Sequence, residues 1–150
     1  MVWTPRVTVA AIIEQQGHYL MVEEHVGGAL SAFNQPAGHL EADESLEQAV
    51  IREVMEETGQ PFKPQAITGI YRWIAPSSGE TYLRVCFYGE VEKTMRTSTP
   101  LDKDIIATHW FTLDEITKLE ERLRSPLVIR CIKDYLSGNR YPLSLFKESP

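Results

Sequence analysis

The sequence predicts an α/β fold in which a β-sheet carries an inserted helix. Apolar and β-branched runs typical of strands recur along the chain, and a helix with clear start and stop signals interrupts them. With 150 residues, of which 43% are hydrophobic, the chain is long enough for one domain with a sizeable core and too short for two. We therefore expect a single domain over residues 1–150.

The chain before the inserted helix predicts two strands and a loop. Residues 7–13, VTVAAII, form a buried strand, and residues 18–23 form a second strand that completes a hairpin with it. Glycine and proline then predict a loop at 25–31 and a short extended segment at 33–37. These elements are scaffold, and they lead into Gly38.

The segment from Gly38 to Gly59 predicts the inserted helix. Asp43, Glu44 and Ser45 suit a helix N-terminus, and Gly59 can end the helix in the left-handed conformation. We expect the helix at about 45–57. Its apolar stripe, which docks it on the sheet, consists of Leu46, Ala49, Val50 and Val54.

The segments after this helix predict three strands and two further helices. Strand composition occurs at 66–74, 82–91 and 105–111, with a turn at 76–79 and a polar surface loop at 93–104. A capping box of Thr112 and Glu115 starts a helix at about 113–121, and Ser125-Pro126 starts a last one at about 126–137. Cys86 and Cys131 are expected to be buried, reduced thiols.

Three carboxylates share one face of the inserted helix. At about 100° per residue, Glu53, Glu56 and Glu57 fall within roughly a third of the circumference because residues three and four apart are neighbours. Like charges this close raise one another's pKa and favour a bound cation. Carboxylate oxygens suit Mg²⁺ or Mn²⁺, and Arg52 can pair with a carboxylate or a phosphate oxygen. By composition alone, an ordinary exposed acidic helix explains the same residues.

The spacing of these residues resembles the signature of the Nudix hydrolase family. Gly38, Glu44, Arg52-Glu53-Val54, Glu56-Glu57 and Gly59 match its fixed positions, while Gln60 stands where the family has an apolar residue. The segments NQPAGHLEADESLEQAVIREVMEETG, RWIAPSSGETYLRVCF, LRSPLV and YLSGNRYPL further resemble bacterial NudJ-type phosphatases, in the same order. The resemblance implies an α/β/α sandwich with a mixed sheet and a catalytic motif at 38–60.

The resemblance also implies an activity and a set of residue roles. The expected activity is Mg²⁺-dependent hydrolysis of nucleoside di- and triphosphates and of pyrimidine diphosphates such as hydroxymethylpyrimidine diphosphate. Glu53, Glu56 and Glu57 then hold one to three magnesium ions. The Gly38 carbonyl is either a further ligand or part of a simple turn, and Glu44 supports the loop and helix or binds an outer metal.

The general base and the ring-binding residues are less constrained by the motif. The base is either a motif glutamate or a loop acid, Asp102 or Asp104, of which Asp104 is preferred because it lies six residues before Trp110. For the substrate ring we expect stacking on aromatic faces. Trp73 is the first choice because it lies towards a strand end; Phe33, where the subgroup has tryptophan, and Tyr82 are further candidates, and Tyr71 is assigned to the core.

Charge and composition restrict the partners. A formal net charge of −6 disfavours binding to nucleic-acid polymers, and no apolar run has transmembrane length. We expect a cytoplasmic monomer or homodimer that acts on small phosphorylated molecules. A dinucleotide or nucleoside-sugar pyrophosphatase is the alternative within the enzyme class, and a non-catalytic nucleotide-binding sensor is the alternative outside it.

Overall fold

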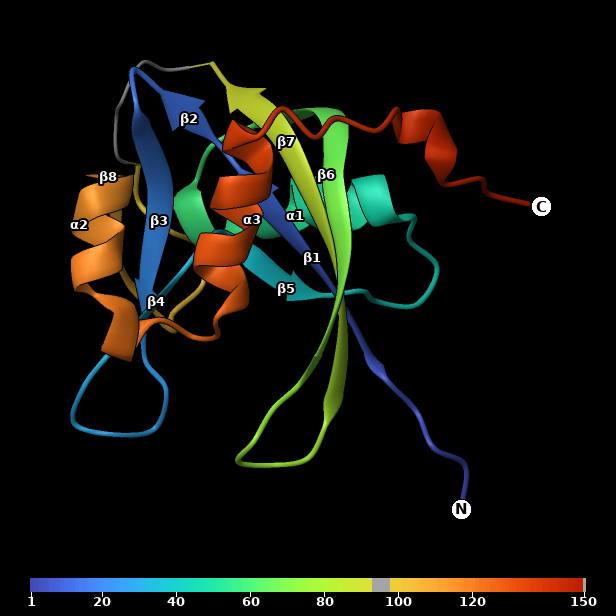
Figure 1. Cartoon of the computed structure of the whole chain (residues 1–150), viewed down its shortest axis with the longest axis horizontal. Helices are drawn as coiled ribbons and strands as arrows, with labels where there is room; N and C mark the ends of the chain where they lie inside the picture. Colours follow the sequence, from blue (N-terminus) through green and yellow to red (C-terminus); the bar gives the residue numbers. More distant parts are fainter. Residues whose placement is uncertain (93–97, 150) are drawn as a thin grey trace.

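The fold is an arrangement of two β-sheets between helices. The computed structural model of the protein describes residues 1–92 and 98–149. Helix α1 (Leu46–Thr58) covers one face of the sheets and α3 (Leu127–Leu136) covers the other (Figure 1). The predicted α/β/α architecture with a mixed sheet is therefore confirmed.

The first sheet is mixed and has the strand order β5-β1-β7-β6. Its strands are β1 (Arg6–Ile12), β5 (Ala37–His39), β6 (Phe62–Ile74) and β7 (Thr81–Val91). Strand β1 runs parallel to β7 and antiparallel to β5. Both edges of β1 are thus occupied by strands from distant parts of the sequence.

The second sheet is built around β3 (His18–Glu24), which pairs with β2 (Glu14–Gln15), β4 (Ala32–Asn34) and β8 (Ile105–Thr112). The predicted hairpin between residues 7–13 and 18–23 is wrong, because β1 and β3 belong to different sheets. The turn at Gln16-Gly17 joins β3 only to the short strand β2. The chain crosses between the sheets at Ile13, whose carbonyl accepts a hydrogen bond from the Leu20 amide at 2.9 Å.

Strand β6 begins at Phe62, earlier than the predicted start at Ala66. Pro64 lies inside it, opposite Gly89, and the register shifts between Pro64 and Ala66. Proline lacks the amide hydrogen that a strand interior needs, but it is tolerated on an edge strand or at a bulge. Because β6 is the edge strand of its sheet, the proline does not stop it.

The C-terminal helices differ slightly from the predicted ones. The helix expected at 113–121 is α2 (Leu113–Lys118), followed by a 3₁₀ turn, η1 (Glu120–Arg122). Helix α3 ends close to the predicted position, and a second 3₁₀ turn, η2, covers Leu143–Leu145. Part of the predicted 93–104 loop, residues 93–97, lies outside the described residues. No described helix is long and apolar enough to span a membrane.

Apolar side chains fill two core layers, one on each side of the first sheet. The layer under α1 contains Leu46, Ala49, Val50 and Val54 of the helix together with Val9, Ala11, Val85 and Phe87 of β1 and β7. The layer under α3 contains Val128, Cys131, Ile132 and Tyr135 with Ala10, Ile12, Tyr71 and Cys86. Adjacent residues of β1 face opposite layers because side chains alternate along a strand. The two cysteines are free and buried, as expected.

Candidate active site

Helix α1 is fixed at both ends by local interactions. The Ser45 hydroxyl accepts a hydrogen bond from the Gln48 amide at 3.1 Å, and the Gln48 side chain accepts one from the Ser45 amide at 2.8 Å. This capping box satisfies two amides at the helix start. Gly59 closes the helix with φ of 71°, a left-handed conformation that favours glycine. The predicted helix is therefore confirmed to within one residue at each end.

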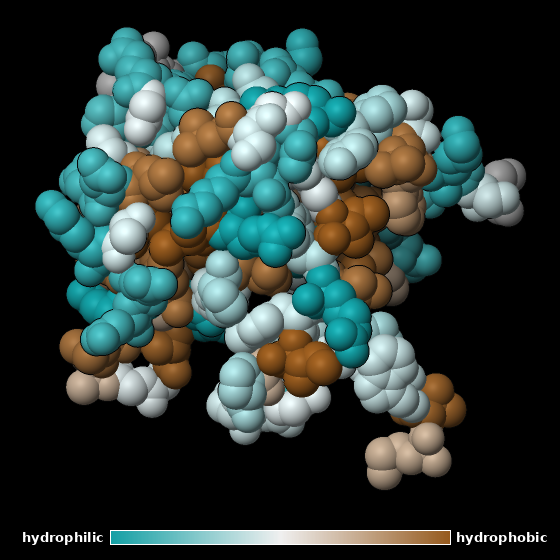
Figure 2. Space-filling view, in the orientation of Figure 1, coloured by the Kyte–Doolittle hydropathy of each residue, from teal (hydrophilic) through white to brown (hydrophobic). Residues whose placement is uncertain are grey.

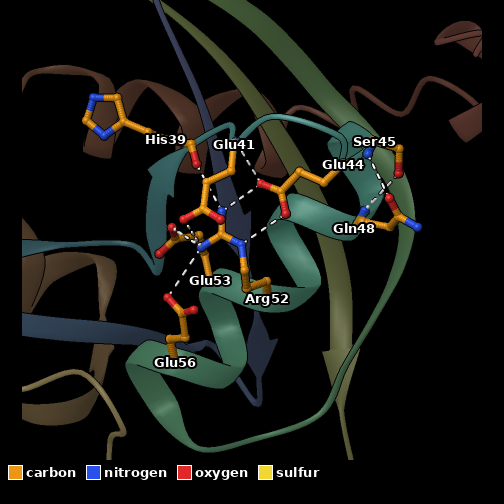
Figure 3. A network of polar contacts seen from close by, with 8 residues as sticks. All are labelled: His39, Glu41, Glu44, Ser45, Gln48, Arg52, Glu53 and Glu56. Carbon is orange, nitrogen blue, oxygen red and sulfur yellow. Dashed lines mark hydrogen bonds and ion pairs between the residues drawn. The ribbon is translucent and has the colours of Figure 1, made fainter.

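Arg52 is the centre of the charge network on this helix (Figure 3). Its guanidinium donates to both carboxylate oxygens of Glu44, at 2.7 and 3.0 Å, and to Glu53 at 2.7 Å. It also reaches Glu56 at 3.3 Å and the His39 carbonyl at 3.0 Å. The Arg52 bond holds the pKa of Glu44 below its usual range. Arg52 therefore ties the loop before the helix to the acidic face.

Glu53 and Glu57 turn from the acidic face into the interior. Burial raises the pKa of both carboxyl groups, although Arg52 opposes this shift at Glu53 and the Ala37 amide opposes it at Glu57. That amide donates to Glu57 Oε1 at 2.8 Å. Neighbouring carboxylates raise the Glu57 pKa further. The electrostatics of the site thus favour an additional positive charge beside these two groups.

Gly38 lies directly against Glu53. A Cβ atom at position 38 would come within 2.1 Å of Glu53 Cδ, a distance at which one of the two must move. The absence of a side chain therefore lets the β5 backbone approach the Glu53 carboxylate. Gly38 opposes Val9 of β1, so the sheet fixes the position of this backbone.

The acids of the loop before β8 lie on the same side of the molecule. The amides of Leu101 and Asp102 both donate to the Glu56 carbonyl, at 2.8 and 2.9 Å, which ties the loop to α1. The Asp102 charge raises the pKa of both Glu53 and Glu57. The Asp104 carbonyl accepts a bond from the His25 amide at 2.8 Å, and the charges of Asp102 and Asp104 both raise the pKa of Glu24.

Glu24 is an acidic residue that the sequence analysis did not identify. It ends β3, lines the cleft described below, and raises the pKa of Glu57. Burial raises the pKa of Glu24 itself, and Arg124 lies 3.6 Å from its carboxylate. Its neighbour Glu23 bonds instead to Ser31 and His109. The sequence gives little indication of this role, because two adjacent glutamates at the end of a strand are usually exposed to solvent.

A cleft of about 560 Å³ opens beside this acidic group. It lies between the segment of residues 25–31 and the tip of the β6–β7 hairpin, where Figure 2 shows an indentation in the outline of the molecule. The polar and aromatic residues that line the cleft, together with Gly38, include Thr8, Glu24, Asn34, His39, Trp73, Tyr82, Arg84 and Arg124. The cleft thus joins the catalytic motif to the aromatic residues of the hairpin.

The predicted aromatic residues separate into two groups. Trp73 and Tyr82 both line the cleft, and their ring centroids lie 5.7 Å apart with planes inclined by 37°. Phe33 is 5% exposed and packs in the core, where it contacts Phe111 and the Arg122 guanidinium. It does not line the cleft. Tyr71 is also in the core and donates a hydrogen bond to Asp134, as its assignment to the interior predicts.

The residues present fit a magnesium ion in their chemistry. All acidic donors offer oxygen, which Mg²⁺ prefers, and the absence of a Cβ at Gly38 lets the Glu53 carboxyl group lie against the β5 backbone. Among residues 1–92 and 98–149, no three acidic, histidine or cysteine side chains already converge as a metal site. Glu53 is held by Arg52, and Glu57 by the Ala37 amide. Each of these bonds uses only one oxygen of its carboxylate, Oε1.

Comparison with known proteins decides the family. The model of the NUDIX domain matches residues 3–130. The chain belongs to the Nudix hydrolase family. This Nudix hydrolase is 45% identical over 141 residues to proteins named Phosphatase NudJ of Shigella boydii and Escherichia coli K12, which covers 94% of this chain and 90% of each relative. A solved structure, a NUDIX hydrolase from Nitrosomonas europaea, has a TM-score of 0.92 at 49% identity and covers 97% of this chain and 98% of that one.

Family membership confirms that the chain is a hydrolase. Nudix hydrolases act on small phosphorylated molecules and generally use divalent metal ions. Gln60, the one departure from the motif, is 1% exposed. This Nudix hydrolase thus places a polar side chain in the interior where its family has an apolar one.

Proposed function

We propose that this Nudix hydrolase is an Mg²⁺-dependent phosphatase of nucleoside di- and triphosphates and of pyrimidine diphosphates such as hydroxymethylpyrimidine diphosphate. The observation that carries the proposal is the cleft, which runs from Gly38, the residue that lies against Glu53, to the Trp73–Tyr82 pair. In the proposal, one substrate places its diphosphate at the carboxylates and its flat ring at the aromatic pair. The similarity to proteins named Phosphatase NudJ supports orthophosphate as the released product.

In this proposal, Glu53, Glu56 and Glu57 hold the metal, with the Gly38 carbonyl beside them, and Glu44 and Arg52 keep the acidic face in position. The ion would supply charge neutralisation at the phosphoryl oxygens and a bound water of lowered pKa. The protein contributes orientation, because phosphoryl transfer needs positioning and charge stabilisation more than covalent chemistry. The buried walls around Glu53 and Glu57 strengthen these electrostatic interactions.

The test is product analysis on a panel of substrates. We expect orthophosphate from nucleoside di- and triphosphates and from hydroxymethylpyrimidine diphosphate when Mg²⁺ is present, and no turnover after exhaustive chelation with EDTA. Nucleoside monophosphate and pyrophosphate from a labelled triphosphate would favour the pyrophosphatase alternative. Tight nucleotide binding without any turnover would favour the sensor, and turnover in EDTA would contradict the metal requirement.

The proton acceptor for the attacking water is a separate question. Asp104 was preferred from sequence, but the position of the Asp102 charge near Glu53 and Glu57 favours Asp102. We expect Asp102→Asn to lower kcat by about 100-fold, the lower end of the range for general-base loss. Asp104→Asn should lower it much less. The pH profile of kcat for both variants is the measurement, and the reverse order would restore Asp104 as the base.

Replacement of Trp73 tests the ring end of the cleft. We expect Trp73→Ala to raise KM for nucleotides about tenfold, which corresponds to roughly 1.4 kcal/mol, with a much smaller change in kcat. Stacking on the ring is remote from the bond that breaks, so it contributes equally to the ground state and the transition state. Steady-state kinetics decide the result.

The matched control is Trp3→Ala, since Trp3 is 70% exposed at the N-terminus and does not line the cleft. An unchanged KM in a folded Trp73→Ala variant, or a loss in kcat alone, would remove Trp73 from substrate binding. Phe33 is not available to stack on the substrate ring instead, because its own ring is enclosed by Phe111, His109 and Arg122.

A further inference from the structure

Arg84 brings a positive charge into the floor of the cleft. The residue is 5% exposed and lines the cleft from β7. It lies opposite Thr8 of β1, and Thr8 lies opposite His39 of β5. Directly opposed residues of neighbouring strands project to the same face of a sheet. Arg84, Thr8 and His39 therefore form a polar row across the cleft floor, between the aromatic pair and Gly38.

The contacts of Arg84 orient its guanidinium without neutralising it. Nη1 donates to Gln35 Oε1 at 2.9 Å and contacts Cys131 Sγ at 4.0 Å, while Nη2 donates to Asn34 Oδ1 at 2.9 Å. Two of these partners are neutral amide oxygens, and the third is the Cys131 thiol, whose pKa is lowered to about 7 by its hydrogen bond with Cys86 and by the Arg84 charge. Within the described part of the chain, no carboxylate oxygen lies within ion-pair distance of Arg84.

The other arginines at the site differ in this respect. Arg52 is paired with Glu44 at 2.7 Å, and Arg124 lies 3.6 Å from Glu24. A guanidinium remains charged at every physiological pH, and burying a charge without a counter-ion is unfavourable. Arg84 therefore lacks a direct carboxylate partner among the described residues, although its charge also acts on Glu24 and on the Cys131 thiol.

A purely structural role does not account for this charge. Gln35 Nε2 donates to the Val128 carbonyl at 2.7 Å, so the Arg84–Gln35 contact does connect β7 to α3. A neutral donor would make that connection equally well, because the acceptors are amide oxygens. The guanidinium also has five N–H groups, and its described contacts use the two Nη atoms, which leaves Nε–H available.

We propose that Arg84, together with the side-chain amide of Asn34, binds the phosphate group that remains on the product after hydrolysis. The inference rests on the proposed function and extends it. It names the residues that bind the part of the substrate between the ring and the departing phosphoryl group. Arg84 follows Tyr82 by two residues on the same face of β7 and so lies one step closer to the catalytic motif than the aromatic pair. Guanidinium groups match phosphate oxygens in geometry and charge.

The experiment measures binding without turnover. Cytidine and CMP are titrated into the protein in EDTA by isothermal calorimetry, and the ratio of their dissociation constants isolates the contribution of the phosphate. We expect the wild type to bind CMP about tenfold more tightly than cytidine, in line with a charge-assisted contact. Arg84→Gln should reduce this ratio to about one and leave cytidine binding unchanged, and Arg84→Lys should keep part of the preference.

The matched control is Arg72→Gln, which removes the same charge from an exposed position on β6 and should keep the wild-type ratio. A structural role for Arg84 would weaken cytidine and CMP equally, so an unchanged ratio in Arg84→Gln would overturn the proposal. If that variant does not fold, binding to the wild-type protein still tests the proposal. Equal affinity of the wild type for cytidine and CMP would overturn it. Inorganic phosphate bound as tightly as CMP would also overturn it. A protein with the tenfold preference but no phosphatase activity would refute the proposed function alone.

Discussion

Glu57→Gln and Glu53→Gln are each expected to reduce kcat at least about 100-fold while the protein remains folded. Each substitution keeps the shape of the side chain and removes one negative charge from the group that holds the metal and supports water activation. Glu57 Oε1 accepts its hydrogen bond from the Ala37 amide, and the glutamine carbonyl can accept the same bond. Steady-state kinetics with circular dichroism as a folding check are the measurement.

Glu47→Gln is the internal control on the same helix. Glu47 is exposed in the first turn and lies about 120° around the helix from Glu53, so its charge is remote from the acidic face. We expect near wild-type activity. Equal losses in the Glu47 and Glu57 variants would show that the catalytic face has been assigned to the wrong side of α1.

Gly38→Ala should also lower kcat strongly, by at least about tenfold, with little loss of thermal stability. The new Cβ would meet the Glu53 carboxyl group, with Cδ 2.1 Å away and both oxygens within 2.4 Å. Because this carboxyl is the end of a flexible side chain, it can rotate away at low energetic cost. Rotation removes it from the metal site, and a displacement of about 1 Å in a catalytic group can cost about 100-fold in rate.

Gly28→Ala provides the comparison for this variant. Gly28 lies in the 25–31 segment, and a Cβ at that position would meet no atom within 4 Å. We expect this variant to be as active as the wild type. If Gly38→Ala kept full activity at an unchanged melting temperature, close approach of the β5 backbone to Glu53 would not be required for catalysis.

The features predicted correctly from sequence depend on local signals. The ends of α1 follow from Ser45 and Gly59, because capping involves residues within one turn. Trp73 and Tyr82 were placed near the site because a turn at Pro76 puts them at strand ends. The acidic face was recognised as functional from the family signature. The spacing of its glutamates alone is equally consistent with an ordinary solvated helix.

The features that sequence did not predict depend on pairing between distant residues. β1 was assigned to a hairpin with its nearest neighbour, whereas the structure pairs it with β5 and β7. Glu24 and Arg84 reach the site from β3 and β7, and nothing near them in the sequence indicates this. Phe33 shows the opposite error: it lies close to the motif in the chain, but β4 directs its ring into the core.

The β6–β7 hairpin gives the two ends of the cleft different mechanical support. Strand β1 pairs with β7 only from Tyr82 to Tyr88, so beyond the Trp73–Tyr82 rung the hairpin continues as two strands that project from the sheet (Figure 1). A two-stranded ribbon is only marginally stable by itself, whereas Gly38 and α1 are anchored in the core. In the proposed function, the core therefore holds the metal end of the cleft, and the Trp73–Tyr82 pair lies where support from β1 ends. Under the proposed function, we expect such support to restrict the position of the cleaved bond more than the identity of the attached base.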